Sequence, residues 1–353
     1  MAVCIVTGCL GLIGSEAVRQ FHADGYKVVG IDNNSRKSFF GEEGNNETTL
    51  DEFFDLREFE FIPADIRNYD AIKSVFETYG SNIEIVIHTA SLPAHDTCDQ
   101  QPYLAYSVNV TGTFNMLELT KIFCPNALFI FTSSSKVYGN RHSSLDYVEL
   151  DTRYDFDKNH ELYDGIPETW NPDSDDRSML GSTKLAADVL CQQFSLTYGI
   201  RMGIWRPGTL TAPAHAGTTQ HGFLSYLTKC AITKTPYVIN GYNKKQLRDV
   251  WHSYDVVNAF KQFIKKPKQL GIWNIGGSRH SNISMIEAIN VIEEYTEEKM
   301  NIEYNPVPRK ADHLIWIGSA NKFLKDYPSY TWKYTVEETI KELVDNWKVK
   351  LNG

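Results

Sequence analysis

Residues 3–14 read VCIVTGCLGLIG, in which a run of Val and Ile leads into three glycines spaced three apart. The run Val3 to Thr7 predicts a buried strand, and the pattern from Ser15 to Asp24 predicts a helix. A glycine trio alone also fits an ordinary turn, but glycines between a strand and a helix let backbone N–H groups approach a pyrophosphate closely. We therefore predict a dinucleotide-binding turn with contacts from Gly8, Gly11, Leu12 and Ile13.

Strand-like and helix-like patterns alternate through the residues that follow. The expected strands are almost continuous in Val and Ile, as in sheets that helices cover on both faces. This alternation predicts βαβ units, and therefore an α/β fold with a Rossmann-type, doubly wound parallel sheet. The expected strands are Val3 to Thr7, Lys27 to Asp32, Phe59 to Pro63, Ile85 to Thr89, Ala127 to Thr132 and Gly199 to Arg206, and the expected helices are Ser15 to Asp24, Tyr69 to Tyr79, Tyr103 to Phe123 and Ser182 to Tyr198.

The second half of the chain has a different composition. Residues 207–250 are rich in Gly, Thr, Pro and His, and residues 305–333 in Pro, aromatic and charged residues. Between these segments, Ser284 to Glu298 predicts a helix that begins with a capping box. Residues 33–57 are polar, and we expect them to form a surface excursion.

The length of 353 residues fits one large domain or two domains that share a core. We expect residues 1–206 to form the dinucleotide-binding Rossmann domain, with part of 246–275 folded back onto it. Residues 207–353 are expected to form mainly a smaller C-terminal, substrate-binding lobe.

Composition narrows the class of protein. The net charge of −9 argues against broad binding to nucleic acid or to anionic membranes. The apolar runs are strand-sized, so we expect no membrane span and no signal peptide. The six scattered cysteines and ten histidines form no CxxC, HExxH or HxH pattern. We therefore expect reduced thiols, a cytoplasmic location and no catalytic metal.

The second expected strand ends at Asp32, eighteen residues after Gly14. A carboxylate at this position accepts both hydroxyls of an adenosine ribose and repels a 2′-phosphate, so it favours NAD over NADP. Arg36 and Lys37 argue the other way, because basic residues can bind that phosphate. Asp65, after the third strand, is expected beside the adenine, although it also fits a helix-capping turn. The predicted adenosine contacts are Asp32, Asn33, Asn34, Ser35, Arg36, Asp65 and Ile66.

Four further segments carry motifs at strand ends or on helices. They are His88-Thr89-Ala90-Ser91, Asn109-Val110-Thr111-Gly112-Thr113, Thr132-Ser133-Ser134-Ser135-Lys136-Val137-Tyr138-Gly139 and Gly181-Ser182-Thr183-Lys184. With the GxxGxxG spacing of the glycine turn, they resemble the extended short-chain dehydrogenase/reductase superfamily and its NAD-dependent epimerase/dehydratase family over nearly the whole chain. The resemblance implies NAD as the cofactor, with further contacts at Thr89, Ala90, Ser91, Asn109 and Lys184.

The same resemblance implies catalytic roles. A Ser or Thr, here Ser134, binds the reacting sugar hydroxyl, and a Tyr removes the proton of that hydroxyl. A Lys four residues after the Tyr, here Lys184, binds the nicotinamide ribose and lowers the pKa of the Tyr. The tyrosine position is Leu180 in this chain, and leucine cannot exchange a proton.

Another group must therefore transfer the proton, or the chain has lost this chemistry. In these folds the loop after the fourth strand borders the sugar, and here it contains His95 and Asp96. His95 is the first candidate, because an unperturbed imidazole pKa of about 6.5 suits proton transfer at neutral pH. The alternative is that His95 only orients the substrate or caps a turn. Tyr138 and Cys98 are weaker candidates.

The residues after Ser134 separate two activities within the family. The 4,6-dehydratases carry an Asp-Glu pair where this chain has Ser135-Lys136, so dehydration is disfavoured. Epimerisation needs only oxidation of a carbinol, repositioning of the keto sugar and return of the hydride. The Lys-containing segment resembles the CDP-tyvelose (CDP-paratose) 2-epimerase branch, as do residues 32–37, 152–154 and 246–250.

We therefore expect an NAD-dependent epimerase of a nucleotide-diphosphate sugar, most like the CDP-hexose 2-epimerases. The alternatives are a UDP-hexose 4-epimerase or related oxidoreductase, and a protein that binds NAD and a nucleotide sugar without turnover. Leu180 is the main support for the last of these.

Substrate contacts are expected from both halves of the chain. Arginine suits bidentate contacts to phosphate, although each arginine also fits a surface salt bridge. The superfamily commonly forms homodimers through the helices that hold Asn109 and Lys184, so a homodimer is expected. The predicted substrate contacts are His95, Asp96, Ser134, Gln220, His221, Arg248 and Arg309.

Overall fold

The computed structural model describes residues 1–173, 176–219, 221–309 and 312–352, and these residues fold into two compact units. The units are Met1–Val137 with Met179–Arg206 and Val256–Ile272, and Tyr138–Ser178 with Pro207–Asp255 and Trp273–Gly353. The sequence-based division places residues 138–178 in the first domain, whereas the structure places them in the second unit. The reason is long-range pairing: Tyr154 donates its backbone N–H to the Lys245 carbonyl at 3.0 Å, and Ile166 forms a β-bridge with Gly318.

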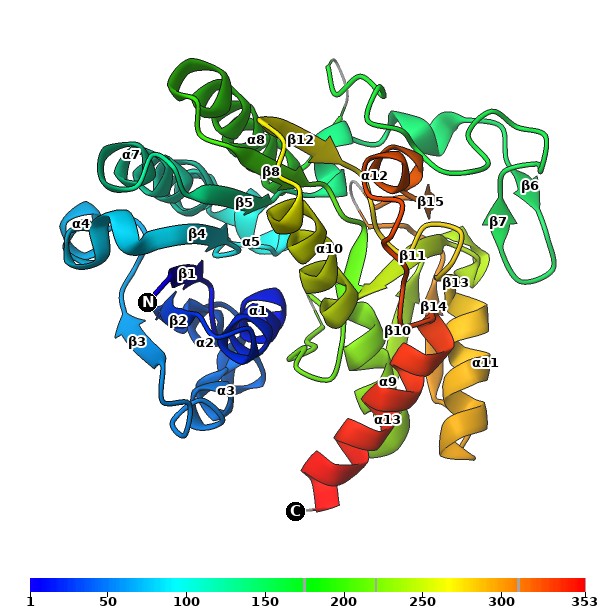
Figure 1. The fold of residues 1–353 in the computed structure, drawn as a ribbon. Helices are drawn as coiled ribbons and strands as arrows, with labels where there is room; N and C mark the ends of the chain where they lie inside the picture. Colours follow the sequence, from blue (N-terminus) through cyan, green and yellow to red (C-terminus); the bar gives the residue numbers. More distant parts are fainter. Residues whose placement is uncertain (174–175, 220, 310–311, 353) are drawn as a thin grey trace. The chain divides into compact units, whose positions relative to one another are not determined.

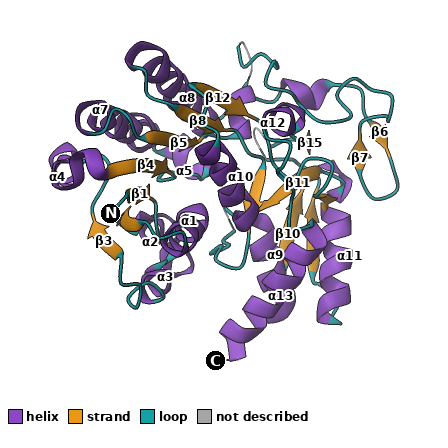
Figure 2. Ribbon diagram, in the orientation of Figure 1, coloured by secondary structure: helices purple, strands orange, loops and turns teal. Residues whose placement is uncertain are grey.

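The first unit contains a seven-stranded sheet in the order β12-β8-β5-β4-β1-β2-β3 (Figures 1 and 2). Strands β1 to β5 and β8 pair in parallel, and β12 lies at the edge beside β8. The predicted Rossmann-type α/β fold is confirmed. The strands are β1 (Val3–Thr7), β2 (Lys27–Asp32), β3 (Phe59–Pro63), β4 (Ile83–His88), β5 (Leu128–Thr132), β8 (Met202–Trp205) and β12 (Leu270–Trp273).

Helices cover both faces of this sheet. Val3 and Ile5 of β1 belong to a buried cluster with apolar residues of α4, α7 and α8. Trp205 of β8 packs instead against Phe260 and Phe263 of α10, as expected when successive strand residues point to opposite faces. The helices of this unit are α1 (Leu12–Ala23), α2 (Ser35–Phe40), α3 (Glu47–Asp51), α4 (Tyr69–Tyr79), α5 (His95–Gln100), α6 (Pro102–Tyr106), a π-helical turn (Ser107–Gly112), α7 (Thr113–Phe123), α8 (Met179–Tyr198) and α10 (Ser253–Lys265).

The second unit is built from short strands around β11. This strand pairs with β9 and β15 in parallel and with β13 antiparallel. Ser284 forms the predicted capping box with Glu287 at the start of α11. The elements are β6 (Val148–Glu149), β7 (Tyr154–Asp155), β9 (Thr209–Thr211), α9 (Phe223–Thr233), β10 (Tyr237–Asn240), β11 (Leu247–His252), β13 (Asn282–Ser284), α11 (Met285–Thr296), β14 (Ile302–Asn305), β15 (Ile315–Trp316), α12 (Asn321–Asp326) and α13 (Val336–Asn352).

All six cysteines are buried thiols. In the part of the chain that the structure describes, no helix is long and apolar enough to cross a membrane. The same described residues contain no group of three or more His, Cys, Asp or Glu side chains arranged to hold a metal ion.

Candidate cofactor and substrate site

The glycine turn lies between β1 and α1, as predicted. Gly8 has a φ of +70°, a left-handed conformation in which a side chain is strained. A Cβ on Gly14 would lie 2.0 Å from the Gly8 carbonyl oxygen, so only glycine lets α1 approach the turn this closely. Gly11 precedes the helix without a side-chain cap, which leaves the N–H groups at Leu12 and Ile13 suited to an anion.

Asp32, at the end of β2, holds the glycine turn from the other side. Its carboxylate accepts the Leu10 N–H at 3.0 Å and the Asn34 N–H at 2.8 Å. Burial raises the pKa of Asp32, and the two backbone donors partly offset that effect. The carboxylate is therefore fixed beside the turn, where it suits the hydroxyls of a ribose.

The basic residues that argued for NADP both have partners in the excursion after β2. The Arg36 guanidinium carbon lies 4.9 Å from the centre of the Phe40 ring, and burial lowers the Arg36 pKa to about 10. The Lys37 ammonium lies 3.2 Å from Glu42 and 3.8 Å from Glu47. Both basic side chains are thus held within this excursion.

Asp65 lies where the sequence predicts an adenine contact. It accepts hydrogen bonds from Asn33 at 2.9 Å and from Arg67 at 2.7 Å. Burial raises the pKa of Asp65, but the bonds from Arg67 and Asn33 outweigh burial and the pKa lies below its usual value. Ile66 is buried against Gly112, while Ser35 begins α2 with its N–H bonded to the Asn33 side chain at 3.1 Å.

The segment after β4 packs directly against the glycine turn. Thr89 bonds the Thr7 carbonyl through its hydroxyl at 2.7 Å and its N–H at 3.2 Å. A Cβ on Gly8 would lie 2.8 Å from the Ala90 nitrogen, so Ala90 borders the turn closely. Ser91 follows Ala90 and is partly exposed. The structure thus brings residues 89–91 together with the predicted pyrophosphate turn.

Asn109 lies in the π-helical turn and is buried. Its carboxamide oxygen accepts the Leu92 N–H at 2.8 Å, and its amide nitrogen donates to the Thr183 hydroxyl at 3.0 Å. Asn109 therefore joins the loop after β4 to helix α8. Since π-helical turns occur frequently at functional sites, this location supports a role at the cofactor site.

The Lys184 side chain reaches the end of β5, two residues before Ser134. The Lys184 ammonium donates to the Thr132 carbonyl at 2.5 Å and lies 4.6 Å from the centre of the Phe131 ring. Burial lowers the Lys184 pKa to about 8, so the side chain is mostly protonated at neutral pH. Ser134, two residues after Thr132, is partly exposed, and its hydroxyl oxygen accepts the Lys136 N–H at 3.2 Å.

A buried ion pair holds this region in place. Asp188, one turn after Lys184, accepts hydrogen bonds from the Ser133 hydroxyl at 2.6 Å and from Arg206 at 2.8 Å and 2.9 Å. Sequence reasoning missed this pair, because Ser133, Asp188 and Arg206 share no local motif. Asp188 fixes the chain immediately before Ser134 against α8.

Leu180 is buried in an apolar corner formed with Leu92, Cys98 and Ala105. Burial raises the Cys98 pKa to about 12, and its thiol donates to the Leu92 carbonyl at 3.5 Å. Cys98 is therefore unsuited to proton transfer at neutral pH. Tyr138 belongs to the second unit, where its hydroxyl donates to Asn274 at 2.8 Å.

His95 is the first residue of α5 and is partly buried, whereas Asp96 is exposed. Asp99 lies one turn after His95 on the same face of α5 and accepts the Met179 N–H at 2.9 Å. Asp99 thus caps α8 immediately before Leu180. This contact, which no sequence motif signals, orients the His95 face of α5 towards the start of α8.

The second unit holds the other predicted substrate residues. The Arg248 guanidinium donates to Asp312 at 2.6 Å and to the Leu247 carbonyl at 2.8 Å. His221 lies 3.2 Å from His215 between ring nitrogens, and Arg309 is exposed. Gln220 lies outside the described residues.

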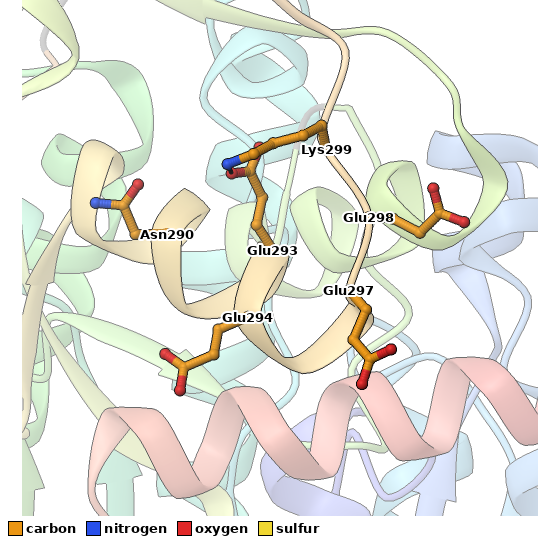
Figure 3. A pocket seen from close by; sticks show the side chains of 6 residues that line it. All are labelled: Asn290, Glu293, Glu294, Glu297, Glu298 and Lys299. Atoms are coloured by element: carbon orange, nitrogen blue, oxygen red, sulfur yellow. Dashed lines mark hydrogen bonds and ion pairs between the residues drawn. The ribbon is translucent and has the colours of Figure 1, made fainter.

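A pocket of about 460 Å³ lies elsewhere in the second unit, at the end of α11 (Figure 3). Glu293 pairs there with Lys299 and accepts the Met300 N–H at 2.9 Å. None of the predicted site residues lines this pocket, whose lining is Asn290, Glu293, Glu294, Glu297, Glu298 and Lys299.

The strand order, the uncapped start of α1 and the fixed Asp32 carboxylate define a dinucleotide-binding α/β protein. A family model described as the NAD dependent epimerase/dehydratase family matches residues 4–276, and the chain belongs to this family. Because this family is NAD-dependent, the prediction of NAD as the cofactor is confirmed. The uncapped start of α1 after the glycine turn and the Asp32 carboxylate beside that turn suit this cofactor.

The similarity to named epimerases covers almost the whole chain. A CDP-paratose 2-epimerase from Salmonella typhi is 25% identical over 348 residues, which are 97% of this chain and 98% of the relative. A UDP-glucuronate 4-epimerase from Thermodesulfobacterium geofontis is 26% identical over 353 residues, covering 98% and 96%. The crystal structure of a UDP-glucose 4-epimerase from Thermotoga maritima is similar with a TM-score of 0.79 at 22% identity, covering 99% of both chains, and shows the shared fold.

Proposed function

We propose that this chain is an NAD-dependent epimerase of a nucleotide-diphosphate sugar, which inverts C2 of a CDP-hexose through a transient keto sugar. The observation that carries the proposal is the hydrogen bond from the Lys184 ammonium to the Thr132 carbonyl at 2.5 Å, two residues before Ser134 at the end of β5. In this proposal the Ser134 hydroxyl binds the sugar, and the Lys184 ammonium binds the nicotinamide ribose. The similarity to a CDP-paratose 2-epimerase supports the choice of sugar nucleotide.

The chain's own residues would divide the reaction between them. Ser134 donates a hydrogen bond that orients the reacting sugar hydroxyl, and Lys184 binds the ribose hydroxyls of the cofactor. His95 accepts the proton of the sugar hydroxyl during oxidation and returns it during reduction. Bound NAD would supply a reversible hydride acceptor, so oxidation to the keto sugar and reduction at its opposite face would need no external reductant.

Two features support epimerisation over dehydration. Ser135 and Lys136 follow Ser134 where the dehydratases carry an acid pair, so no carboxylic acid stands there to eliminate water. Ser135 is also buried, as the first residue of a short 3-10 helix. The segment therefore serves as a support for Ser134 in this proposal.

The second unit would bind the nucleotide diphosphate through Arg248 and Arg309, while Gln220 and His221 would line the sugar or nucleotide pocket. Arg309 is exposed, so its guanidinium is accessible to a phosphate. Arg248 already pairs with Asp312, so a phosphate would have to compete with that carboxylate for the guanidinium. In this proposal Asp96, exposed beside His95, contributes to the sugar end of the substrate.

We also propose a homodimer through the helices that hold Asn109 and Lys184. The exposed fractions of Tyr103, Val189 and Leu196 are 83%, 52% and 67%, and these side chains belong to α6 and α8. By contrast, Met116 and Leu117 of α7 face the sheet and are fully buried. A second copy of the chain would cover the exposed side chains.

The test of the activity is an NMR time course with NAD and separate CDP-hexoses and UDP-hexoses. A new C2 epimer from a CDP-hexose alone is the expected result. A C4 epimer from a UDP-hexose would instead assign a UDP-hexose 4-epimerase. Protein that binds NAD and CDP-hexose but leaves every sugar unchanged would overturn the proposal in favour of a binding protein.

The test of His95 uses two substitutions. His95→Ala removes the imidazole, and His95→Gln keeps a hydrogen-bonding side chain that cannot carry the proton at neutral pH. If His95 transfers the proton, both variants should lose about 10²–10⁴-fold in turnover while retaining NAD binding. The matched control is His22→Gln on α1. Full activity of His95→Gln would show that His95 only orients the substrate.

A further inference from the structure

A chain of hydrogen bonds crosses the interior of the first unit through His88, the last residue of β4. Its Nδ1 lies 2.7 Å from the Thr7 hydroxyl, and its Nε2 lies 2.9 Å from the Thr113 hydroxyl. The Thr113 hydroxyl continues to the Asn109 carbonyl at 2.7 Å. The side chains of Thr7, His88 and Thr113 are all buried, with exposed fractions of 0%, 0% and 1%.

The hydrogen-bond network assigns the tautomer of His88. A carbonyl oxygen can only accept, so the single proton of the Thr113 hydroxyl points to Asn109. The Thr113 oxygen must then accept from Nε2, which places the imidazole proton on that nitrogen. Nδ1 is left as an acceptor for the Thr7 hydroxyl, and the Thr7 oxygen in turn accepts the Ala90 N–H at 3.3 Å.

The two ends of this chain reach the two parts of the cofactor site. At one end, Thr7 directly precedes Gly8, and Ala90 borders the glycine turn. At the other end, Asn109 holds the Leu92 backbone and the Thr183 hydroxyl, one residue before Lys184.

We propose that neutral His88 is a positioning residue that couples the glycine turn and Ala90 to the π-helical turn at Asn109, and through it to the lysine-bearing helix α8. A change at either end of this hydrogen-bond network would then alter the NAD contacts made at its other end. This coupling lies within the cofactor site, so it does not depend on which sugar is the substrate.

The surroundings keep the imidazole neutral. Burial lowers the His88 pKa to about 3, with a smaller effect of the Lys184 charge in the same direction. Phe131 stacks on the ring at 5.8 Å between centroids, and Phe129 lies at 6.1 Å. These rings hold the plane of the imidazole, so both nitrogens stay aimed at their hydroxyl partners.

The experiment compares two threonines on α7 that differ in one contact. Thr113 and Thr120 are both buried, and each donates to the carbonyl four residues earlier at 2.7 Å. Only Thr113 also accepts from His88. The Kd of NAD, measured by calorimetry, should rise about tenfold in Thr113→Val and change less than about twofold in Thr120→Val. Equal effects of the two substitutions would overturn the proposal.

Variants of His88 test the coupling directly. His88→Phe retains the stacking on Phe131 but loses both hydrogen bonds, and should weaken NAD binding by at least about tenfold. His88→Asn keeps an acceptor for Thr7, and should recover part of this loss. Equal NAD binding by the Phe and Asn variants would assign His88 a packing role alone.

One measurement needs no substitution. Nitrogen-15 NMR of histidine in the unaltered protein should show His88 as the neutral Nε2–H tautomer from pH 5 to pH 9, with no titration. A charged ring or the Nδ1–H tautomer at neutral pH would overturn the assignment, whether or not the variants fold.

Discussion

Helix α8 presents two contrasting surroundings one turn apart. Lys184 lies against the Thr132 carbonyl and the Phe131 ring, and its neighbour Thr183 bonds Asn109. Leu180, four residues earlier, lies in an apolar corner. The lysine that we propose to hold the cofactor ribose thus has polar partners, whereas Leu180, at the position that resembles the family's tyrosine, belongs to a hydrophobic cluster. One helix turn thus separates a buried cation bonded to a carbonyl from a leucine packed among apolar side chains.

The largest expected effect comes from removing the charge at the first of these positions. Lys184→Met keeps the aliphatic stem against Phe131 and removes the ammonium. Turnover should fall by about 10²–10³-fold, and NAD should bind more weakly, because a buried donor to the cofactor is lost. The NMR time course measures turnover, and calorimetry measures NAD binding. Lys121→Met on α7, where Lys121 pairs with Glu118, is the control; a similar loss there would contradict the assignment.

The second effect is on the pH profile. The folded protein holds Lys184 with a pKa of about 8, below its ordinary value of 10.5, so the needed ammonium is lost as pH rises. Turnover should fall about tenfold per pH unit above that pKa. Between about 8 and 10.5 the unfolded chain binds the extra proton, so this group makes the folded state more stable as pH rises. Thermal unfolding of the protein and of Lys184→Met across this range measures the difference.

The third prediction concerns the apolar corner. Leu180→Tyr should destabilise the fold by about 1–3 kcal/mol, because the larger side chain overpacks the space beside Leu92 and Ala105. Leu180→Phe separates bulk from the hydroxyl and should cost a similar amount in denaturant unfolding. In a His95→Ala background, Leu180→Tyr should restore turnover, whereas Leu180→Phe should not. Wild-type stability of the Tyr variant would mean that the corner is loosely packed.

The smallest effect is at the start of α8. Asp99→Ala removes the cap on the Met179 N–H and should cost about 0.5–2 kcal/mol of unfolding free energy. Gln100→Ala, at the exposed neighbouring position, should leave stability nearly unchanged. If both substitutions cost the same, the contact between α5 and α8 is not a cap.

The first half of the fold could be predicted closely from local patterns. Val3 to Thr7, Lys27 to Asp32 and Phe59 to Pro63 form strands at the predicted bounds, because each apolar run ends in turn-forming or polar residues. The expected strand Gly199 to Arg206 is shorter, Met202–Trp205, and the excursion after β2 contains the short helices α2 and α3. Short elements of this kind depend on partners that the local pattern does not show.

In the candidate site, too, local features could be predicted from the sequence and contacts between distant residues could not. The glycine turn and Asp32 could be predicted because their chemistry depends on adjacent backbone and one strand end. The link between Asp188 and Arg206 could not, since ion pairs of distant residues leave no periodic signal. Arg248 shows the same limit: its residue type suits phosphate, yet only the structure reveals that Asp312 occupies its guanidinium.

The burial of the cysteines has a kinetic consequence. A thiol reagent can reach Cys98 only when the corner around Leu180 opens, and can reach Cys4 in β1 only when the central sheet separates. The labelling rates of these two thiols therefore report two different motions, the local opening of the corner around Leu180 and the unfolding of the whole sheet.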